Sequence, residues 1–166
     1  FVDTRWYTDE GRIRGSLVAL VTELSDKGTL IERAMMFFAK ESGLDLPGYL
    51  SCWRKFRKAW PFETVHIEQP IYHPQWRYCG TPDRDIDLFE GKPAVLEIKT
   101  GAREDWHALQ TAAYAYCCPT FAQRFAVYLS ADRDAVLVEH TDSADEPTWL
   151  GAIQMFQWKE KHGYAT

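Results

Sequence analysis

The sequence has no apolar run long enough to cross a membrane. A spanning helix needs about 20 consecutive apolar residues, and no stretch of this 166-residue chain approaches that length. Nor do the first residues show the charged and apolar regions of a secretory signal. We therefore expect a protein without a membrane partner that works in the cytoplasm.

Cysteine is scarce, and positive charge is not in excess. The four cysteines, at 52, 79, 117 and 118, lack the spacing of a zinc clip and are expected to be reduced, buried thiols. Nineteen Lys and Arg against 24 Asp and Glu leave a net charge of −5. That balance disfavours a nucleic-acid partner, because non-specific binders are usually basic. Net charge does not predict nucleic-acid binding, however, where carboxylates hold divalent cations, because these cations supply positive charge locally.

What the chain does contain is enough apolar material for one core. Hydrophobic residues make up 46% of it, including seven Trp, eight Tyr and nine Phe, which is typical of a folded globule. A chain of this length fits a single domain over residues 1–166, and no repeat or Gly/Ser-rich linker divides it. Because the sequence begins with Phe1, we expect that a native N-terminal segment is missing.

Hydrophobic periodicity and turn residues predict alternating groups of helices and strands. Thr29 is expected to cap the second helix and Gly43 to end it. The predicted helices are 16–28, 29–43, 46–60, 104–118 and 146–162, and the predicted strands are 63–73, 77–89, 93–100, 124–130 and 135–141. This order predicts one mixed α/β (α+β) domain.

The segment GTPDRDIDLFEGKPAVLEIKTG at 80–101 predicts a β-hairpin with carboxylates on one face. A two-residue turn at 90–91 would put acidic and apolar side chains on both faces. A three-residue loop with Gly91 in the left-handed region instead pairs residues whose numbers sum to 180, so that Asp83 lies opposite Glu97. One face is then apolar. The other face carries Asp83, Asp85, Asp87, Glu97 and Lys99.

Two facing carboxylates with a lysine two residues away form a candidate site for a hard cation. Mg²⁺ is typically held by one or two carboxylates, with water and substrate phosphate in its other positions. Such an ion activates water and stabilises a phosphoryl transition state, and Lys99 would act on the water or the phosphate. A solvated acidic strand edge explains the same alternation, and we assign Asp85 and Asp87 mainly to that alternative.

Three short motifs carry a resemblance to a known family. Pro82-Asp83, thirteen intervening residues and then Glu97-Ile98-Lys99 resemble the signature of the PD-(D/E)XK nucleases. In the following helix, Gln110-Thr-Ala-Ala-Tyr114 is similar to the QxxxY element of the RecB-like and lambda-exonuclease-like branch. The combination of GTPDR, LEIKTG and LQTAAYA is far more specific than a lone DxExK, and it resembles phage nucleases of this branch.

The stretch RGSLVALVTE at 14–23 is similar to the RG-x-x-V-H-x-x-x-E pattern of the same branch. It departs from the pattern at Ala19, where the family has a metal-ligating histidine. That departure implies a weaker or different second metal site, a changed cleavage mode, or DNA binding with slow cleavage, and we favour the first. The matching positions are Arg14, Gly15, Val18 and Glu23.

The resemblance, which covers about residues 14–114, implies a restriction-endonuclease-like core with a central mixed β-sheet flanked by helices. It implies that Mg²⁺ or Mn²⁺ is held by Asp83, Glu97 and the Ile98 carbonyl, with Glu23 assisting. It also implies exonuclease action on DNA ends, in recombination or end processing within a bacterial host or phage-infected cell. The catalytic residues would be Asp83, Glu97, Lys99, Gln110 and Tyr114.

Helical spacing independently places Gln110 and Tyr114 on one face, one turn after His107. A Gln amide suits a DNA backbone, and a Tyr ring suits a base or sugar. These three residues and Arg14 are therefore the predicted nucleic-acid contacts. A half-buried core position for Tyr114, with Gln110 on the surface, is the alternative.

The sequence thus predicts a Mg²⁺- or Mn²⁺-dependent deoxyribonuclease whose partner is DNA. Two other functions stay open. One is a DNA-binding module with reduced or lost cleavage, which Ala19 and the negative net charge favour. The other is a subunit that cuts only together with a recombination partner protein.

Overall fold

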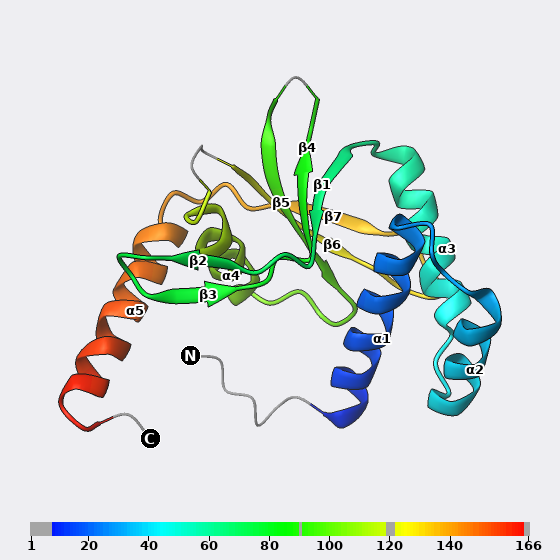
Figure 1. Ribbon diagram of the computed structural model, residues 1–166, viewed down its shortest axis with the longest axis horizontal. Helices are drawn as coiled ribbons and strands as arrows, with labels where there is room; N and C mark the ends of the chain where they lie inside the picture. The colour runs from blue at the N-terminus through cyan, green and yellow to red at the C-terminus, as the bar shows by residue number, and fades with distance from the viewer. Residues whose placement is uncertain (1–7, 90, 119–121, 165–166) are drawn as a thin grey trace.

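The structure is a computed structural model that describes residues 8–89, 91–118 and 122–164. Its strands are β1 Glu63–Ile67, β2 Ile71–His73, β3 Tyr78–Gly80, β4 Arg84–Asp87, β5 Pro93–Lys99, β6 Gln123–Tyr128 and β7 Val136–Glu139. Five of them form one sheet in the order β1-β4-β5-β6-β7, and β2 pairs with β3 in a small second sheet (Figure 1). The β5–β6 pairing is parallel and the other pairings are antiparallel, so the main sheet is mixed, as predicted.

Helices flank the sheet in two groups (Figure 1). The helices are α1 Asp9–Asp26, α2 Glu32–Ser42, α3 Leu46–Ala59, α4 Trp106–Ala115 and α5 Asp145–Lys161. Helices α1 and α3 pack on each other and on one sheet face, where Val18 and Trp53 meet Leu96 in the core. Helix α4 contacts β5, β6 and α5. The predicted mixed α/β architecture with flanking helices is confirmed.

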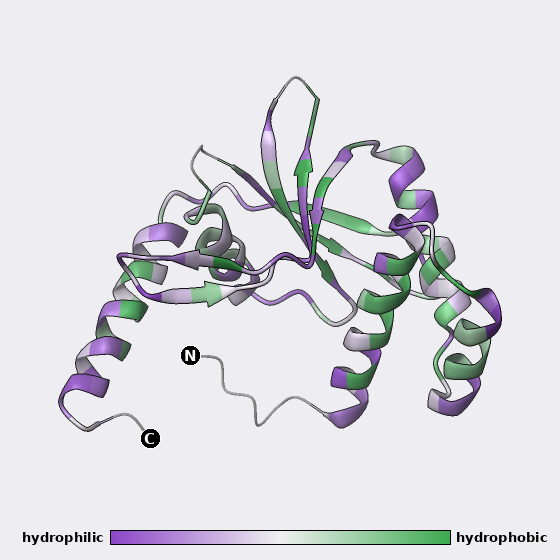
Figure 2. Cartoon of the chain, viewed as in Figure 1, coloured by the Kyte–Doolittle hydropathy of each residue, from purple (hydrophilic) through white to green (hydrophobic). Residues whose placement is uncertain are grey.

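The hydropathy of the elements fits this arrangement. Figure 2 shows α1 and α5 as alternating hydrophilic and hydrophobic bands, while the middle of the main sheet is predominantly hydrophobic. Helix α1 buries Val18 and Val21 in the core, whereas α5 packs on α4 and buries Ile153. In the described ranges, no helix has the length and apolar character of a membrane span.

The start of the second helix was predicted wrongly. Helix α2 begins at Glu32 with Ile31 at its N-cap, because Thr29 still belongs to the end of α1. The Thr29 N–H donates to the Leu24 carbonyl at 2.9 Å, and Gly28 has a φ of 66°. This is the hydrogen-bond pattern of a Schellman cap. The predicted end is confirmed, since Gly43 has a φ of 69°.

Two further boundaries differ from the prediction. Helix α1 starts at Asp9, well before residue 16, because the Thr8 hydroxyl caps it by accepting from the Gly11 N–H. Each long predicted strand is split: 63–73 into β1 and β2, and 77–89 into β3 and β4. Pro70 and Pro82 lie in the two interruptions, and proline has no N–H to give to a sheet ladder.

The predicted hairpin register is confirmed. Arg84 pairs with Leu96, Asp85 with Val95, Ile86 with Ala94 and Asp87 with Pro93. The Leu88 N–H donates to the Lys92 carbonyl at 3.0 Å, and Gly91 has a φ of 75°. The apolar face needs one correction, because it includes Arg84, whose side chain is completely buried.

The cysteine prediction holds in part. All four cysteines are free, and Cys52 is buried, but Cys79 is exposed in β3. Burial raises the pKa of the Cys118 thiol to about 11, which makes it a poor nucleophile.

Candidate active site

Main-chain hydrogen bonds bring Asp83 and Glu97 together. Asp83 lies directly before β4 and Glu97 lies within β5. The Ile98 N–H donates to Oδ2 of Asp83 at 2.6 Å, and the Asp83 N–H donates to Oε1 of Glu97 at 3.2 Å. Each carboxylate therefore accepts a hydrogen bond from the segment that carries the other one. This reciprocal bonding fixes the two acids side by side.

A line of side-chain hydrogen bonds runs from Glu97 to α4. Lys99 Nζ donates to Oε2 of Glu97 at 2.9 Å and to Oε1 of Gln110 at 2.7 Å. Gln110 Nε2 then donates to the Tyr114 hydroxyl oxygen at 3.0 Å. The structure thus joins the predicted catalytic residues into one connected group, in which the Gln110 amide has both of its ends engaged.

Tyr114 also packs tightly against the segment that leads to Asp83. A Cβ added to Gly80 would lie 2.4 Å from Cε1 of the Tyr114 ring, so only glycine lets this ring approach. The ring is half-buried, and burial raises the pKa of the phenol to about 12. Tyr114 therefore has a packing role beside its predicted contact with nucleic acid.

Burial shapes the electrostatics of the two acids. It raises the pKa of Glu97 to about 8, with the Asp83 charge adding to the effect and Lys99 opposing it. Burial also raises the pKa of Asp83, against the Ile98 N–H and the charges of Lys99 and Arg84. Carboxyl groups taken out of water in this way are restored to their ionised form by a nearby cation.

A third acid, Glu68, joins this pair and was missed by the sequence reasoning. It has a φ of 51° in the break between β1 and β2, and its N–H donates to the Asp83 carbonyl at 3.2 Å. Its side chain hydrogen-bonds to Asp83. Burial raises the pKa of Glu68 to about 7, and the negative charge of Asp83 adds to this shift. A signal was present, since Glu68-Gln69-Pro70 interrupts the strand pattern at a proline.

The three acids, Lys99 and Gln110 line one cavity of about 850 Å³ between the hairpin, α1 and α4, whereas Tyr114 is not among its lining residues. Ala19, which departs from the histidine of the motif that this sequence resembles, lies on the α1 wall of the cavity, and its methyl group cannot ligate a metal. Arg14 lies on the same wall. Its buried Nε has no hydrogen-bond partner among the residues that the structure describes. The positive charge of the Arg14 guanidinium on this wall suits an anionic group.

Two further predicted residues, Glu23 and His107, have polar partners other than the predicted catalytic residues. The Glu23 carboxylate pairs with Lys27 and is not among the residues that line the cavity. His107 lines it but is only 5% exposed, with Nδ1 2.7 Å from the Tyr128 hydroxyl. Burial, then the charges of Lys99 and His140, lower its pKa to about 4. At neutral pH this ring therefore offers no positive charge to a phosphate.

The donor set fits a hard divalent cation that keeps water in its shell. Across 8–89, 91–118 and 122–164, no group of three or more His, Cys, Asp and Glu side chains is found that could hold a metal ion, so water and substrate oxygens would have to complete the shell. Asp83 and Glu97 supply two adjacent carboxylates, and Ile98 between them lines the cavity as well. Oxygen ligands of this kind are preferred by Mg²⁺ and Mn²⁺, and not by metals that favour thiolate ligands.

Comparison with solved structures finds a similar fold in a protein from Eubacterium rectale named "Putative exonuclease". The two chains superpose with a TM-score of 0.55 and are 10% identical, over 98% of this chain and 72% of the other. No family model matches the sequence, and no curated protein matches it. At this identity the likeness shows the fold alone. The chain is thus a mixed α/β domain with a five-stranded central sheet flanked by helices, and its candidate site lies at the cavity beside β5.

Proposed function

We propose that this protein is a Mg²⁺- or Mn²⁺-dependent deoxyribonuclease that hydrolyses phosphodiester bonds. The observation that carries the proposal is the reciprocal hydrogen bonding of Asp83 and Glu97, with Lys99 held against Glu97. Asp83, Glu97 and the Ile98 carbonyl would hold the cation. When bound, it would supply an activated water and positive charge opposite the phosphate.

Lys99 is the residue best placed to act on the attacking water or on the phosphate. Its side chain is 15% exposed, and its ammonium is held from two sides by hydrogen bonds to Glu97 and Gln110. A charge held in place in this way stabilises developing negative charge without reorganising. Gln110 would keep the ammonium in register, and Tyr114 would hold the amide of Gln110.

DNA is the proposed substrate in spite of the net charge of −5. The cavity lining includes two cationic side chains, Arg14 and Lys99, among several carboxylates. A DNA backbone would be attracted by these two groups together with the positive charge of the bound cation. Action on DNA ends, in phage-type recombination or end processing in the cytoplasm, is supported by the motif resemblance. The name of the structural neighbour points the same way.

A second candidate is a DNA-binding module with little or no cleavage. Ala19 on the cavity wall favours it, because a methyl group replaces an imidazole that would hold a second cation. Dependence on a recombination partner is a variant of this idea, in which cleavage appears only in the complex.

The test is to incubate end-labelled linear DNA and closed circular DNA with the protein in Mg²⁺, Mn²⁺ or EDTA. We expect metal-dependent loss of label from linear DNA, with the circle intact. Cutting of the circle would replace exonuclease by endonuclease action. Gel-shifted but uncut DNA would favour the binding module. Cleavage by Glu97→Gln equal to that of the wild type would overturn the proposed active site.

A further inference from the structure

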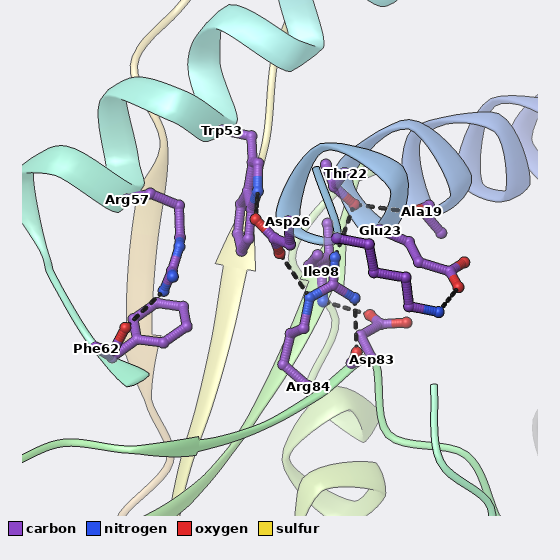
Figure 3. A network of polar contacts seen from close by, with 11 residues as sticks. Ala19, Thr22, Glu23, Asp26, Trp53, Arg57, Phe62, Asp83, Arg84 and Ile98 are labelled. Carbon is purple, nitrogen blue, oxygen red and sulfur yellow. Dashed lines mark hydrogen bonds and ion pairs between the residues drawn. The ribbon is translucent and has the colours of Figure 1, made fainter. Parts of the chain in front are cut away.

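Behind the carboxylates lies a largely buried charged network in which Arg84 and its partner Asp26 do not line the cavity (Figure 3). Its centre is Arg84, which is 0% exposed on the apolar side of the hairpin. Arg84 Nε donates to Oδ2 of Asp26 at 2.9 Å. The other oxygen of Asp26 accepts from the Trp53 indole at 2.9 Å. Asp26 at the end of α1 therefore links α3 to β4.

The guanidinium also bonds directly to the main chain at Asp83. Arg84 Nη1 donates to the Asp83 carbonyl at 2.6 Å, so the side chain folds back on the peptide that precedes it. The same carbonyl accepts from the Glu68 N–H. The main chain of Asp83 is therefore held by donors on two sides while its side chain accepts from Ile98.

The network reaches the opposite wall of the cavity as well. Arg84 Nη2 donates to the Thr22 hydroxyl at 3.4 Å, and that hydroxyl donates to the Ala19 carbonyl at 2.8 Å. Ala19 and Asp83 both line the cavity. From behind, a single guanidinium thus connects the α1 wall to the segment that carries the first acid.

A gain in stability does not by itself explain why the charged pair of Arg84 and Asp26 is buried. Removing two charges from water costs several kcal/mol, and apolar residues of similar volume often stabilise a core as well or better. A guanidinium differs from an apolar residue in its rigid fork of donors, which fixes the directions of several acceptors at once. The pair is therefore better suited to setting geometry than to adding stability.

We propose that Arg84 and Asp26 are positioning residues for the metal-binding acids. The guanidinium, anchored by Asp26, fixes the main chain at Asp83 and so sets how Asp83 and Glu97 present their oxygens to a divalent cation. This inference rests on the proposed function. It adds that metal affinity depends on a charge pair that contacts neither cation nor DNA.

Two variants and two matched controls test it. Arg84→Lys keeps the charge but loses the fork, and Asp26→Asn keeps the shape but loses the charge. The controls, Arg124→Lys and Asp145→Asn, alter another partly buried pair, with Nη1 to Oδ2 at 2.9 Å, that lies on β6 and α5. Urea unfolding confirms that each variant is folded.

Three measurements follow on the folded proteins. Titration calorimetry gives the Kd of Mn²⁺ for the metal-free protein, and cleavage of end-labelled DNA at saturating Mn²⁺ gives kcat and KM. Amide hydrogen exchange of the metal-free protein reports on the segment 81–99. In Arg84→Lys and Asp26→Asn we expect a Mn²⁺ Kd about 10-fold higher and a kcat about 10-fold lower, as for outer partners of metal ligands. KM should change by less than about twofold.

Exchange at the Ile98 amide should be faster in both variants, because its acceptor Asp83 is no longer held. The controls should keep the wild-type Kd, kcat and Ile98 exchange. Folded Arg84→Lys and Asp26→Asn with wild-type Kd, kcat and exchange would overturn the inference and leave the proposed function standing. A wild type that neither binds Mn²⁺ nor cuts DNA would defeat the proposed function. Ile98 exchange would still decide whether Arg84 positions the two acids.

Discussion

The two ends of the β4–β5 hairpin carry the same kind of residue and put it to different uses. At the cavity end, Asp83 and Glu97 accept main-chain hydrogen bonds from each other's segment; Glu97 is 3% exposed, and Asp83 is partly buried. Toward the loop, Asp85 lies 3.4 Å from His66, and Asp87 accepts from the Lys92 N–H at 3.1 Å. This difference indicates that the location of the candidate site depends on the elements that pack over the hairpin, and not on the alternation of acids along the strand.

Neutralising one acid at each end of the hairpin tests most directly whether the two ends have different roles. Glu97→Gln should lower the rate of metal-dependent DNA cleavage by about 1,000-fold or more, because a cation site with one carboxylate left loses several kcal/mol of transition-state stabilisation. Asp87→Asn should leave the rate within about twofold, as expected for a surface carboxylate. Initial rates on end-labelled DNA measure both. Equal losses in the two variants would remove the distinction between the ends.

The lysines of the hairpin offer the next contrast. Lys99→Met should reduce kcat by about 100-fold, because a positioned charge at the reacting group is lost. Lys92→Met is the matched control near the loop and should retain wild-type kcat. Single-turnover rates at saturating Mn²⁺ isolate the chemical step. If exposed Lys92 matters as much as Lys99, the anchoring of Lys99 by Glu97 and Gln110 is irrelevant to catalysis.

Packing at the cavity end gives a smaller effect. Gly80→Ala places a methyl group against the Tyr114 ring, and overpacking of this kind costs about 1–3 kcal/mol of unfolding free energy. Gly151→Ala in α5, where a Cβ would meet nothing within 4 Å, should instead add up to about 1 kcal/mol. Urea unfolding compares the two. A Gly80→Ala protein as stable as the wild type would show that the ring can move aside.

The smallest expected effect concerns the histidines beside α4. Burial lowers the pKa of His107 to about 4 and lowers that of His140. Unfolded histidine has a pKa of about 6.5, so the unfolded chain binds protons more tightly and stability falls as the pH drops from about 6.5 to about 4. His107→Gln should make this decline shallower in urea unfolding across that range. A decline as steep as that of the wild type would assign it to other groups.

Strand alternation and turn residues, which are local features of the sequence, predicted the register of the hairpin. The register followed from alternation and from one glycine, because a slip by a single residue would have turned Ile86 and Leu96 away from the core. The spacing of four in α4 placed Gln110 and Tyr114 on one face, and both reach the same line of hydrogen bonds. In these segments the side-chain direction is set by neighbours in sequence.

Other parts of the site depended on contacts between distant segments. Glu68 reaches Asp83 only because the chain breaks between β1 and β2, and Arg84 is buried only because Asp26 meets it from α1. The sequence analysis did not predict the burial of Arg84, because its partner Asp26 is brought to it only by the packing of α1 on the sheet. Thr29 was misassigned for a similar reason, because the Schellman cap of α1 uses its N–H.

By itself the sequence determined which residues could share a strand face or a helix face, and with them the pairing of Asp83 with Glu97 and of Gln110 with Tyr114. Strand and helix periods are local properties of the backbone. The packing of distant segments determined which of the acids is buried and which arginine is buried behind them. Desolvation depends on every element that covers a group, and that cover is assembled from segments far apart in the chain.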